Sequence, residues 1–163
     1  MAKKNKGKAF EDVIRKAFEA VSGVSIDRFR DAPKKLKNVD NPSDFVVYKR
    51  PHELYVECKS HLGNTLPFSC IRDEQITGMA KKALIPGVTA GLIIWYIEHD
   101  LTVWVPIDVV ITLINFGYKS INIKDLDKFP HLVIHGKKKR VYFEYDIKKF
   151  LEDLYGNNSS VNS

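Results

Sequence analysis

Apolar residues recur at helical spacing near the start of the chain. They are separated by three or four residues, as one face of a helix requires, and fall at Phe10, Val13, Ile14, Ala17, Phe18 and Val21. We therefore expect a helix over residues 10–21, closed by Gly23, and then a short strand over residues 26–29. Residues 30–42 are polar, basic and bounded by prolines, which predicts a loop or a projecting arm.

The middle of the chain alternates between extended runs and one amphipathic segment. Residues 44–48 and 53–59 predict two strands joined by a four-residue turn. A helix is expected over residues 71–84, because Ile71, Gln75 and Met79 are spaced by four and share a face. Residues 89–97 and 101–105 then predict two core strands around a turn at residues 98–100.

The last third predicts smaller elements. Pro106 suits the first turn of a helix that runs to about residue 116. Residues 132–134 and 141–143 are expected to form a late hairpin around Gly136, and Asp146 to cap a final helix that ends near residue 155. Residues 156–163 are expected to be a disordered tail. The element order predicts a single α/β domain over residues 1–155, in which a mixed β-sheet is flanked by helices.

Composition agrees with one globular domain of this size. The chain has 163 residues, of which 44% are hydrophobic and 28% charged. Its longest apolar stretch, residues 88–97, is far shorter than a membrane span, and no apolar stretch follows the basic start MAKKNKGK as a secretion signal would require. We expect a cytoplasmic protein with no membrane partner, in which Cys58 and Cys70 are free thiols.

Basic residues exceed acidic ones by 26 to 20, giving a net charge of +6 and a pI of about 9.2. Such an excess favours polyanionic partners, because neutralising phosphates releases counterions. The basic residues form three clusters, each of which alone is typical of a solvated tail or turn. These clusters are Lys3, Lys4, Lys6 and Lys8; Lys34, Lys35 and Lys37; and Lys137 to Arg140. Together they favour a nucleic acid as the partner.

The predicted hairpin brings two carboxylates together. A four-residue turn pairs Tyr48 with Glu53, and the same register places Asp44 opposite Glu57 on one face of the sheet. The Cβ atoms of directly opposed residues lie roughly 4.5–5.5 Å apart, so two carboxylates there repel each other unless one is protonated or a cation lies between them. Magnesium binds through one or two carboxylates, waters and phosphate oxygens. The geometry therefore predicts a site for a divalent cation.

Lys59 shares the face of Glu57, two residues further along the strand, where its ammonium could orient a water or balance charge on a phosphate. Glu11 falls beside Phe18 at the border of the first apolar stripe, and Gln75 lies within an apolar stripe, where it needs a hydrogen-bond partner. Alternatives stay open for each residue. The pair of Glu57 and Lys59 is also compatible with a solvated face, Glu11 with a surface position and Gln75 with the margin of its stripe.

Four segments together resemble a known family. They are Asn5-Lys6-Gly7-Lys8 leading to Phe10-Glu11, Pro42-Ser43-Asp44-Phe45, Glu57-Cys58-Lys59, and Leu66-Pro67-Phe68 followed by Gln75. The chain resembles the RecU-type Holliday junction resolvases of low-GC Gram-positive bacteria and their phages, which belong to the PD-(D/E)xK nuclease superfamily. The resemblance spans roughly residues 5–155, and its diagnostic part ends near residue 79. The compact chain favours a phage-borne version.

The resemblance implies a restriction-endonuclease-like fold and a homodimer that cuts two strands of a four-way DNA junction symmetrically with Mg²⁺ or Mn²⁺. It implies that Asp44, Glu57 and the backbone carbonyl of Cys58 bind the metal and that Lys59 is the catalytic lysine. Glu11, acting through water, and Gln75 match further active-site positions. A basic stalk is expected over residues 28–41, with a recombinase or branch-migration helicase as candidate protein partners. The DNA-binding candidates are Lys6, where the family commonly has arginine, Lys8, Arg28, Arg30, Lys34, Lys35 and Lys37.

Three other hypotheses remain at this stage. The first is a restriction-like or repair nuclease of the same superfamily that acts on duplex or flapped DNA. The second is a DNA-binding protein of the same fold whose carboxylates are inert. The third is a site built from histidines, although the five histidines are scattered without the spacing of metal ligands; they are His52, His61, His99, His131 and His135.

Overall fold

A six-stranded mixed sheet forms the centre of the protein. The structure is a computed structural model that describes residues 6–30 and 41–156. The strands follow the order β1-β2-β3-β5-β6-β8, in which β3 and β5 are parallel and the other neighbours antiparallel. Their bounds are Ser25–Arg28 for β1, Phe45–Lys49 for β2, His52–His61 for β3, Val88–Tyr96 for β5, Leu101–Pro106 for β6 and Leu132–Val133 for β8.

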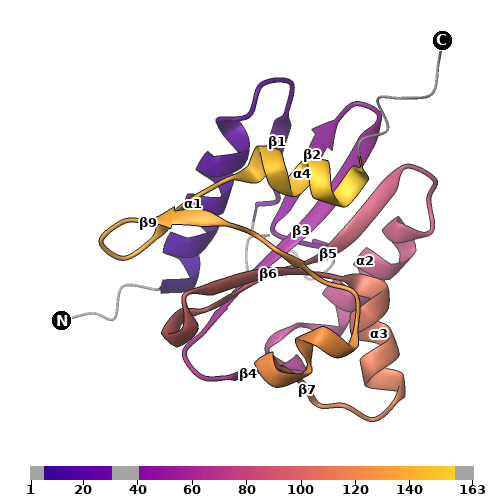
Figure 1. Ribbon diagram of the computed structural model, residues 1–163. Helices are drawn as coiled ribbons and strands as arrows, with labels where there is room; N and C mark the ends of the chain where they lie inside the picture. The colour runs from indigo at the N-terminus through magenta and orange to yellow at the C-terminus, as the bar shows by residue number, and fades with distance from the viewer. Residues whose placement is uncertain (1–5, 31–40, 157–163) are drawn as a thin grey trace.

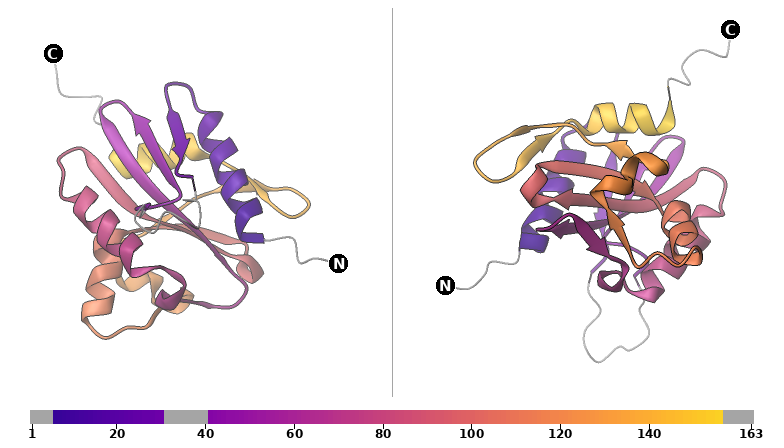
Figure 2. Two further views of the ribbon diagram at one scale, coloured as in Figure 1. Left: turned by 180° about the vertical axis from the view of Figure 1, so that it is seen from behind. Right: turned by 60° about the horizontal axis from the view of Figure 1, so that its bottom comes forward.

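Helices cover both faces of this sheet (Figures 1 and 2). Their bounds are Lys6–Glu19 for α1, Asp73–Ala83 for α2, Ile107–Asn115 for α3 and Ile147–Tyr155 for α4. Helices α1 and α4 pack on one face, and α2 and α3 on the other. Helix α2 lies in the crossover between β3 and β5, which two parallel strands require. The protein is thus a single α/β domain with a mixed sheet flanked by helices, as predicted.

The two faces have separate hydrophobic cores, and alternate residues of β3 point into different ones. Leu54, Val56 and Cys58 belong to the core under α1 and α4, whereas Tyr55 belongs to the core under α2 and α3. Alternation along a strand therefore directs Glu57 towards the side of α2. Strand β5 is buried continuously from Ala90 to Tyr96, as expected of a central strand covered on both faces.

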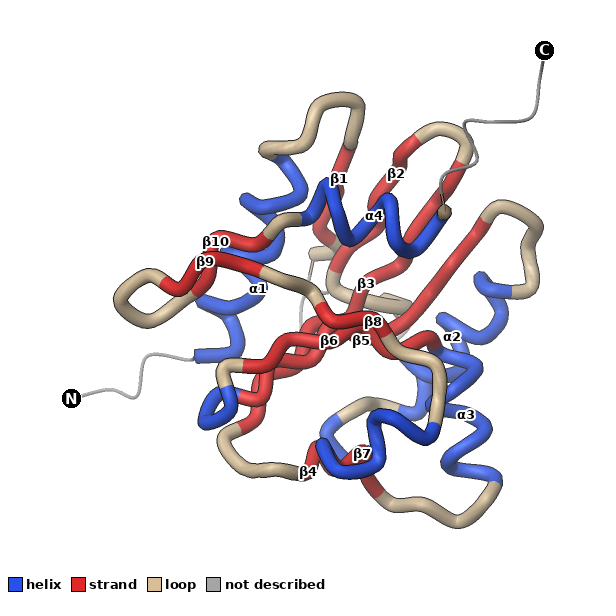
Figure 3. The backbone as a smooth tube through the Cα atoms, in the orientation of Figure 1, coloured by secondary structure: helices blue, strands red, loops and turns tan. Residues whose placement is uncertain are grey.

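Smaller elements complete the chain. Strand β4 (Thr65–Pro67) pairs with β7 (Ser120–Asn122), and β9 (Gly136–Lys138) pairs with β10 (Phe143–Tyr145) in a hairpin beside α1 (Figure 3). Three 3-10 helices span Phe68–Cys70, Ile97–His99 and Ile123–Lys128.

The predicted late hairpin over residues 132–134 and 141–143 is wrong. Residues Leu132 and Val133 form β8 and pair with β6, whose edge would otherwise be left unpaired. The hairpin lies later in the chain, between β9 and β10. Gly136 begins β9 instead of turning the chain, and it permits close approach of the partner strand, since an added Cβ would lie 2.9 Å from the Glu144 carbonyl oxygen.

Other boundaries differ by a few residues. Helix α1 begins at Lys6 and ends at Glu19, and α2 begins at Asp73 because Ile71 and Arg72 have extended backbone conformations. Strands β4 and β7 were not predicted from the sequence. Residues 31–40 of the expected stalk and residues 157–163 of the expected tail lie outside the described residues. Within the described residues, no helix has the length and apolar character needed to cross a membrane.

Candidate active site

Asp44 is held between the two strands that flank it. Its backbone N–H donates to the carbonyl of Val56 (3.1 Å), and its own carbonyl accepts from the N–H of Phe29 (3.0 Å). Its side chain adds a third link, because Oδ2 accepts a hydrogen bond from the backbone N–H of Cys58 (2.8 Å). The predicted register of the hairpin is correct, with Tyr48 opposite Glu53. Asp44 itself precedes the first residue of β2, and its carboxylate reaches across to β3.

Glu57 is the most buried acidic residue of the site. Its side chain is only 2% exposed, and an ion pair of 2.8 Å joins Oε1 to the Nζ atom of Lys59. The other oxygen, Oε2, is buried without a hydrogen-bond partner. Burying a carboxylate oxygen without a hydrogen-bond donor costs on the order of several kcal/mol, because the lost hydration is not replaced. A cation or a further hydrogen-bond donor at Oε2 would offset this cost.

The charges of the site act on one another. Burial first, and then the negative charge of Glu57, raise the pKa of Asp44 from 3.8 to about 7, although the hydrogen bond from Cys58 opposes the rise. The pKa of Glu11 is also raised. Burial and the charge of Glu57 raise it, and the charge of Arg28 opposes them. The structure thus brings three predicted acidic residues into one electrostatic environment.

Lys59 supplies positive charge to the same place. Burial by itself would lower the pKa of Lys59, but the charge of Glu57 and the hydrogen bond to it outweigh burial, so the pKa is raised. The ammonium is therefore kept protonated within a site that contains more carboxylates than cations. Its side chain is 22% exposed, which leaves it accessible to a bound phosphate.

The oxygen donors of the site suit a hard divalent cation that completes its coordination shell with water and phosphate oxygens. Among residues 6–30 and 41–156, no three His, Cys, Asp or Glu side chains are grouped as a metal cluster. Magnesium does not need such a cluster, because it commonly uses one or two carboxylates and completes its shell with waters and phosphate oxygens. The orphaned oxygen of Glu57 and the carboxylate of Asp44 fit that pattern, with the backbone carbonyl of Cys58 as the predicted third ligand.

The thiol of Cys58 is not one of these donors. It lies in the core on the side of α1 and α4, and burial, followed by the charge of Asp44, raises its pKa well above the ordinary value. The thiol is therefore kept protonated in an apolar environment. Both Cys58 and Cys70 are free, as predicted.

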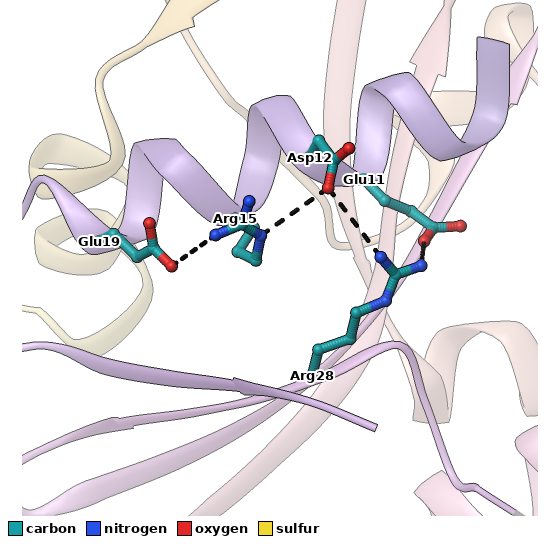
Figure 4. A network of polar contacts seen from close by, with 5 residues as sticks. All are labelled: Glu11, Asp12, Arg15, Glu19 and Arg28. Atoms are coloured by element: carbon teal, nitrogen blue, oxygen red, sulfur yellow. Dashed lines mark hydrogen bonds and ion pairs between the residues drawn. The ribbon is translucent and has the colours of Figure 1, made fainter. Parts of the chain in front are cut away.

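Glu11 is tied to β1 by an arginine that sequence analysis proposed as a DNA-binding residue. Arg28 Nη2 lies 2.6 Å from Glu11 Oε2, and Nη1 of the same guanidinium lies 3.9 Å from Asp12 Oδ1. Figure 4 draws both contacts as dashed lines. Arg15 joins Asp12 to Glu19 further along α1. The guanidinium of Arg28 is thus paired with α1 and positions Glu11, while the residue stays exposed at the end of β1.

Gln75 is buried, at 5% exposure, in the first turn of α2. Its Oε1 accepts from the backbone N–H of Arg72 at 3.3 Å, so at least one of its hydrogen-bonding groups is satisfied by the start of its own helix. This contact accounts for a glutamine in an apolar stripe. The proposed role of Gln75 in the active site stays a prediction.

A close contact from α2 supports the turn before Asp44, and sequence analysis missed it. A Cβ atom added at Gly78 would lie 3.1 Å from Pro42 Cβ and 3.2 Å from Pro42 Cα. Ser43, which is buried, donates from Oγ to the carbonyl of Phe45 (2.8 Å). The only signal in the sequence was a glycine inside a predicted helix, three residues after Gln75.

The proposed DNA-binding residues are only partly described. Lys6 and Lys8 are exposed at the N-terminal end of α1, and Arg30 is exposed where the first described segment ends. The carbonyl of Arg30 accepts from Asn41 Nδ2 (2.7 Å), which closes the base of the proposed stalk. Lys34, Lys35 and Lys37 lie outside the described residues.

Comparison with solved structures gives a structural likeness of low sequence identity. No family model matches the chain, and no curated protein matches it. The fold is similar to that of Hjc, a Holliday junction resolvase from the archaeal hyperthermophile Archaeoglobus fulgidus. That match has a TM-score of 0.47 and 17% sequence identity, and it covers 63% of this chain and 78% of the other.

Proposed function

We propose that this protein is a metal-dependent endodeoxyribonuclease that resolves four-way DNA junctions by paired, symmetric cleavage of two strands. The observation that carries the proposal is the buried Oε2 of Glu57, which has no donor although Lys59 occupies the other oxygen and the charge of Asp44 acts nearby. A divalent cation bound between the carboxylates would remove this imbalance. The sequence resemblance to RecU-type resolvases supports the choice of substrate.

The proposed mechanism divides the work among a few side chains. Asp44 and Glu57 would hold Mg²⁺ or Mn²⁺, together with the carbonyl of Cys58 and, through water, Glu11. A divalent metal held there would supply activation of water and neutralisation of charge on the phosphate. Lys59 would donate to the attacking water or to a phosphate oxygen, since its ammonium stays charged beside Glu57.

The surroundings of the site are proposed to bind the branched DNA. Lys6 and Lys8 would contact phosphates at the N-terminal end of α1, and the basic stalk would extend towards the junction. The Arg30–Asn41 hydrogen bond fixes where that stalk leaves the domain. Two copies of the chain would supply the two cuts, and a recombinase or branch-migration helicase is the proposed type of protein partner.

The test compares substrates and one pair of matched variants. Purified protein with Mg²⁺ is incubated with a mobile four-way junction, a linear duplex and a flap, and the cleaved strands are mapped. We expect symmetric cuts in the junction, loss of cleavage in Glu57→Gln, and retained cleavage in Glu53→Gln, which changes another glutamate of β3. Cleavage by Glu57→Gln at the wild-type rate would contradict the proposed site.

The same experiment separates the alternatives. Preferred cleavage of the duplex or flap would indicate a restriction-like or repair nuclease in place of a resolvase. Junction binding without cleavage, together with no heat of Mn²⁺ binding in calorimetric titration, would indicate a DNA-binding protein of this fold.

A further inference from the structure

The hairpin of β9 and β10 presents four consecutive basic residues outside the main sheet. Lys137 and Lys138 lie on β9, and Lys139 and Arg140 lie in the turn, which is closed by a hydrogen bond from the N–H of Lys139 to the carbonyl of Tyr142 (2.8 Å). All four are exposed. This basic hairpin, residues 136–145, is not used by the proposed active site.

Aromatic contacts fix the position of the basic hairpin. The ring of Tyr142 lies 5.7 Å from that of Trp95, and the ring of Tyr145 lies 6.3 Å from that of Phe10. The hydroxyl of Tyr145 also forms a 2.7 Å hydrogen bond with Thr102. A two-stranded hairpin is marginally stable alone, so these contacts with the domain hold its basic residues in a defined place.

The positive charge of the hairpin is only partly compensated. Lys138 pairs with Asp100, and Lys139 pairs with Glu144 at 2.9 Å. The ion pair with Lys139 and, more weakly, the charge of Lys137 lower the pKa of Glu144. Within the described part of the chain, Arg140 has no acidic partner within ion-pair distance. Four cations thus share two paired carboxylates.

The basic hairpin lies beside the helix that leads to the active site. Strand β10 is in contact with α1, and Figure 3 shows the hairpin alongside that helix. Phe10, which contacts Tyr145, directly precedes Glu11. Lys6 and Lys8 stand on the first turn of the same helix. DNA that passes from the active site over the start of α1 would therefore approach the hairpin.

We propose that the basic hairpin binds the phosphate backbone of a duplex arm of the DNA substrate, at a distance from the cleaved bond. This inference rests on the proposed function for its partner, since DNA is the polyanion on which the active site would act. Ammonium and guanidinium groups bind phosphates without reading sequence, so the hairpin would contribute affinity and orientation. Val141, 55% exposed in the turn, offers an apolar contact to a sugar.

The test measures DNA binding in EDTA, where cleavage is prevented. The affinity for a four-way junction and for a duplex is determined between about 50 and 200 mM KCl. For Lys137→Gln/Arg140→Gln we expect the affinity for both DNAs to fall by roughly fivefold or more. The slope of log affinity against log salt concentration should decrease in magnitude by about 2. The control, Lys81→Gln/Lys124→Gln, removes the same charge from α2 and from the 3-10 helix after β7, and is expected to bind as the wild type does.

Failure of this inference differs from failure of the proposed function. If the wild type cleaves junctions and the hairpin variant binds like the control, the basic hairpin is not a DNA-binding surface. If the wild type neither binds nor cleaves DNA, both proposals are wrong, and a role of the hairpin towards an acidic protein would have to replace this one.

A second measurement needs no variant. Acetylation of surface lysines in the wild-type protein is followed with and without duplex DNA. We expect DNA to protect Lys137 and Lys139 and to leave Lys81 reactive. Equal modification of Lys137 and Lys139 in both samples would overturn the inference, whatever the behaviour of the substituted chains.

Discussion

The charge imbalance around Glu57 is the feature on which the proposed chemistry of this protein depends. Two carboxylates, Asp44 and Glu57, are fixed by the backbone of adjoining strands, and a third, Glu11, is held nearby by Arg28. Only Lys59 compensates them within β3. Carboxylates that face one another are unfavourable unless a cation or a proton intervenes. The repulsion between these carboxylates therefore destabilises the metal-free fold, and a bound metal would remove it.

Removing one negative charge should stabilise the metal-free protein. Because folding raises the pKa of Asp44 from 3.8 to about 7, the folded protein binds this proton more tightly than the unfolded chain does. The resulting stability is fully present below about pH 3.8 and is lost as the pH rises through about 7. At about pH 8 in EDTA, we expect Asp44→Asn to raise the melting temperature by on the order of 5 °C.

The same variant should abolish cleavage and leave junction binding intact or tighter, since the amide oxygen can still accept from Cys58 but binds a metal poorly. Thermal unfolding with and without Mg²⁺ checks whether the variant has lost metal binding. Mg²⁺ is expected to stabilise the wild type and not Asp44→Asn. A melting temperature of Asp44→Asn below that of the wild type in EDTA would be incompatible with a repulsive pair.

Lys59 should matter for stability as well as for catalysis. Lys59→Met leaves the buried Glu57 without its ion-pair partner. Breaking a buried pair costs about 3–5 kcal/mol, and partial exposure of Lys59 reduces this to about 2–4 kcal/mol, or roughly 5–15 °C in melting temperature. The double variant Lys59→Met/Glu57→Gln should recover most of the loss, because no buried charge is left unpaired. No recovery in the double variant would mean that the ion pair is not the source of the loss.

At the scale of elements, two contacts decide where the proposed catalytic residues lie. The β2–β3 hairpin sets the register that places Asp44 beside Glu57 and Lys59. Helix α2 then packs against the turn before β2, because Gly78 has no side chain to separate the helix from Pro42. The position of Asp44 thus depends on a helix that follows it by about thirty residues in the sequence.

Gly78→Ala should impair cleavage with little loss of stability. Alanine favours the helix by about 1 kcal/mol, but its Cβ would lie 3.1 Å from Pro42 and push the helix and the turn apart. A displacement of Asp44 by a fraction of an ångström should lower the cleavage rate by roughly tenfold or more. The rate and the melting temperature are compared with those of Thr77→Ala, an exposed neighbour on α2. Wild-type cleavage by Gly78→Ala would show that the turn tolerates the shift.

At the scale of the whole molecule, each chain provides one set of Asp44, Glu57 and Lys59. Resolution of a four-way junction requires cuts in two strands, so one chain cannot make paired cuts without rebinding. The two hydrophobic cores on either side of the sheet make the chain a domain in its own right. We therefore expect two folded copies to associate, each contributing a complete site.

Sedimentation equilibrium checks the association. We expect twice the chain mass of 18.7 kDa for the free protein, or that mass added to the mass of the DNA for the junction complex. Paired cuts should then appear within the lifetime of one complex on a supercoiled cruciform substrate. A strictly monomeric protein on the junction, with cuts that appear one after the other, would contradict paired cleavage by a dimer.

Much of the fold could be predicted because local patterns agree with the tertiary structure in the first two thirds of the chain. Helix α1, the strands β1, β2, β3, β5 and β6 and the helices α2 and α3 follow periodicities that reflect which face is buried. The late hairpin could not be predicted correctly, because the segment Leu132–Val133 is short and apolar and is equally suited to a hairpin or to the edge of a sheet. Their pairing with Val103 and Trp104 depends on residues distant in sequence.

The candidate site divides in the same way. The sequence by itself determined the alternation that directs Asp44 and Glu57 to one face and the two-residue spacing that adds Lys59, because strand periodicity and hairpin register are local properties. Only the tertiary structure decided that Arg28 binds Glu11, that Gly78 supports Pro42, and that the basic hairpin stands beside α1. Those contacts join segments far apart in the chain, and their geometry is fixed by how the helices pack on the sheet, which no local pattern specifies.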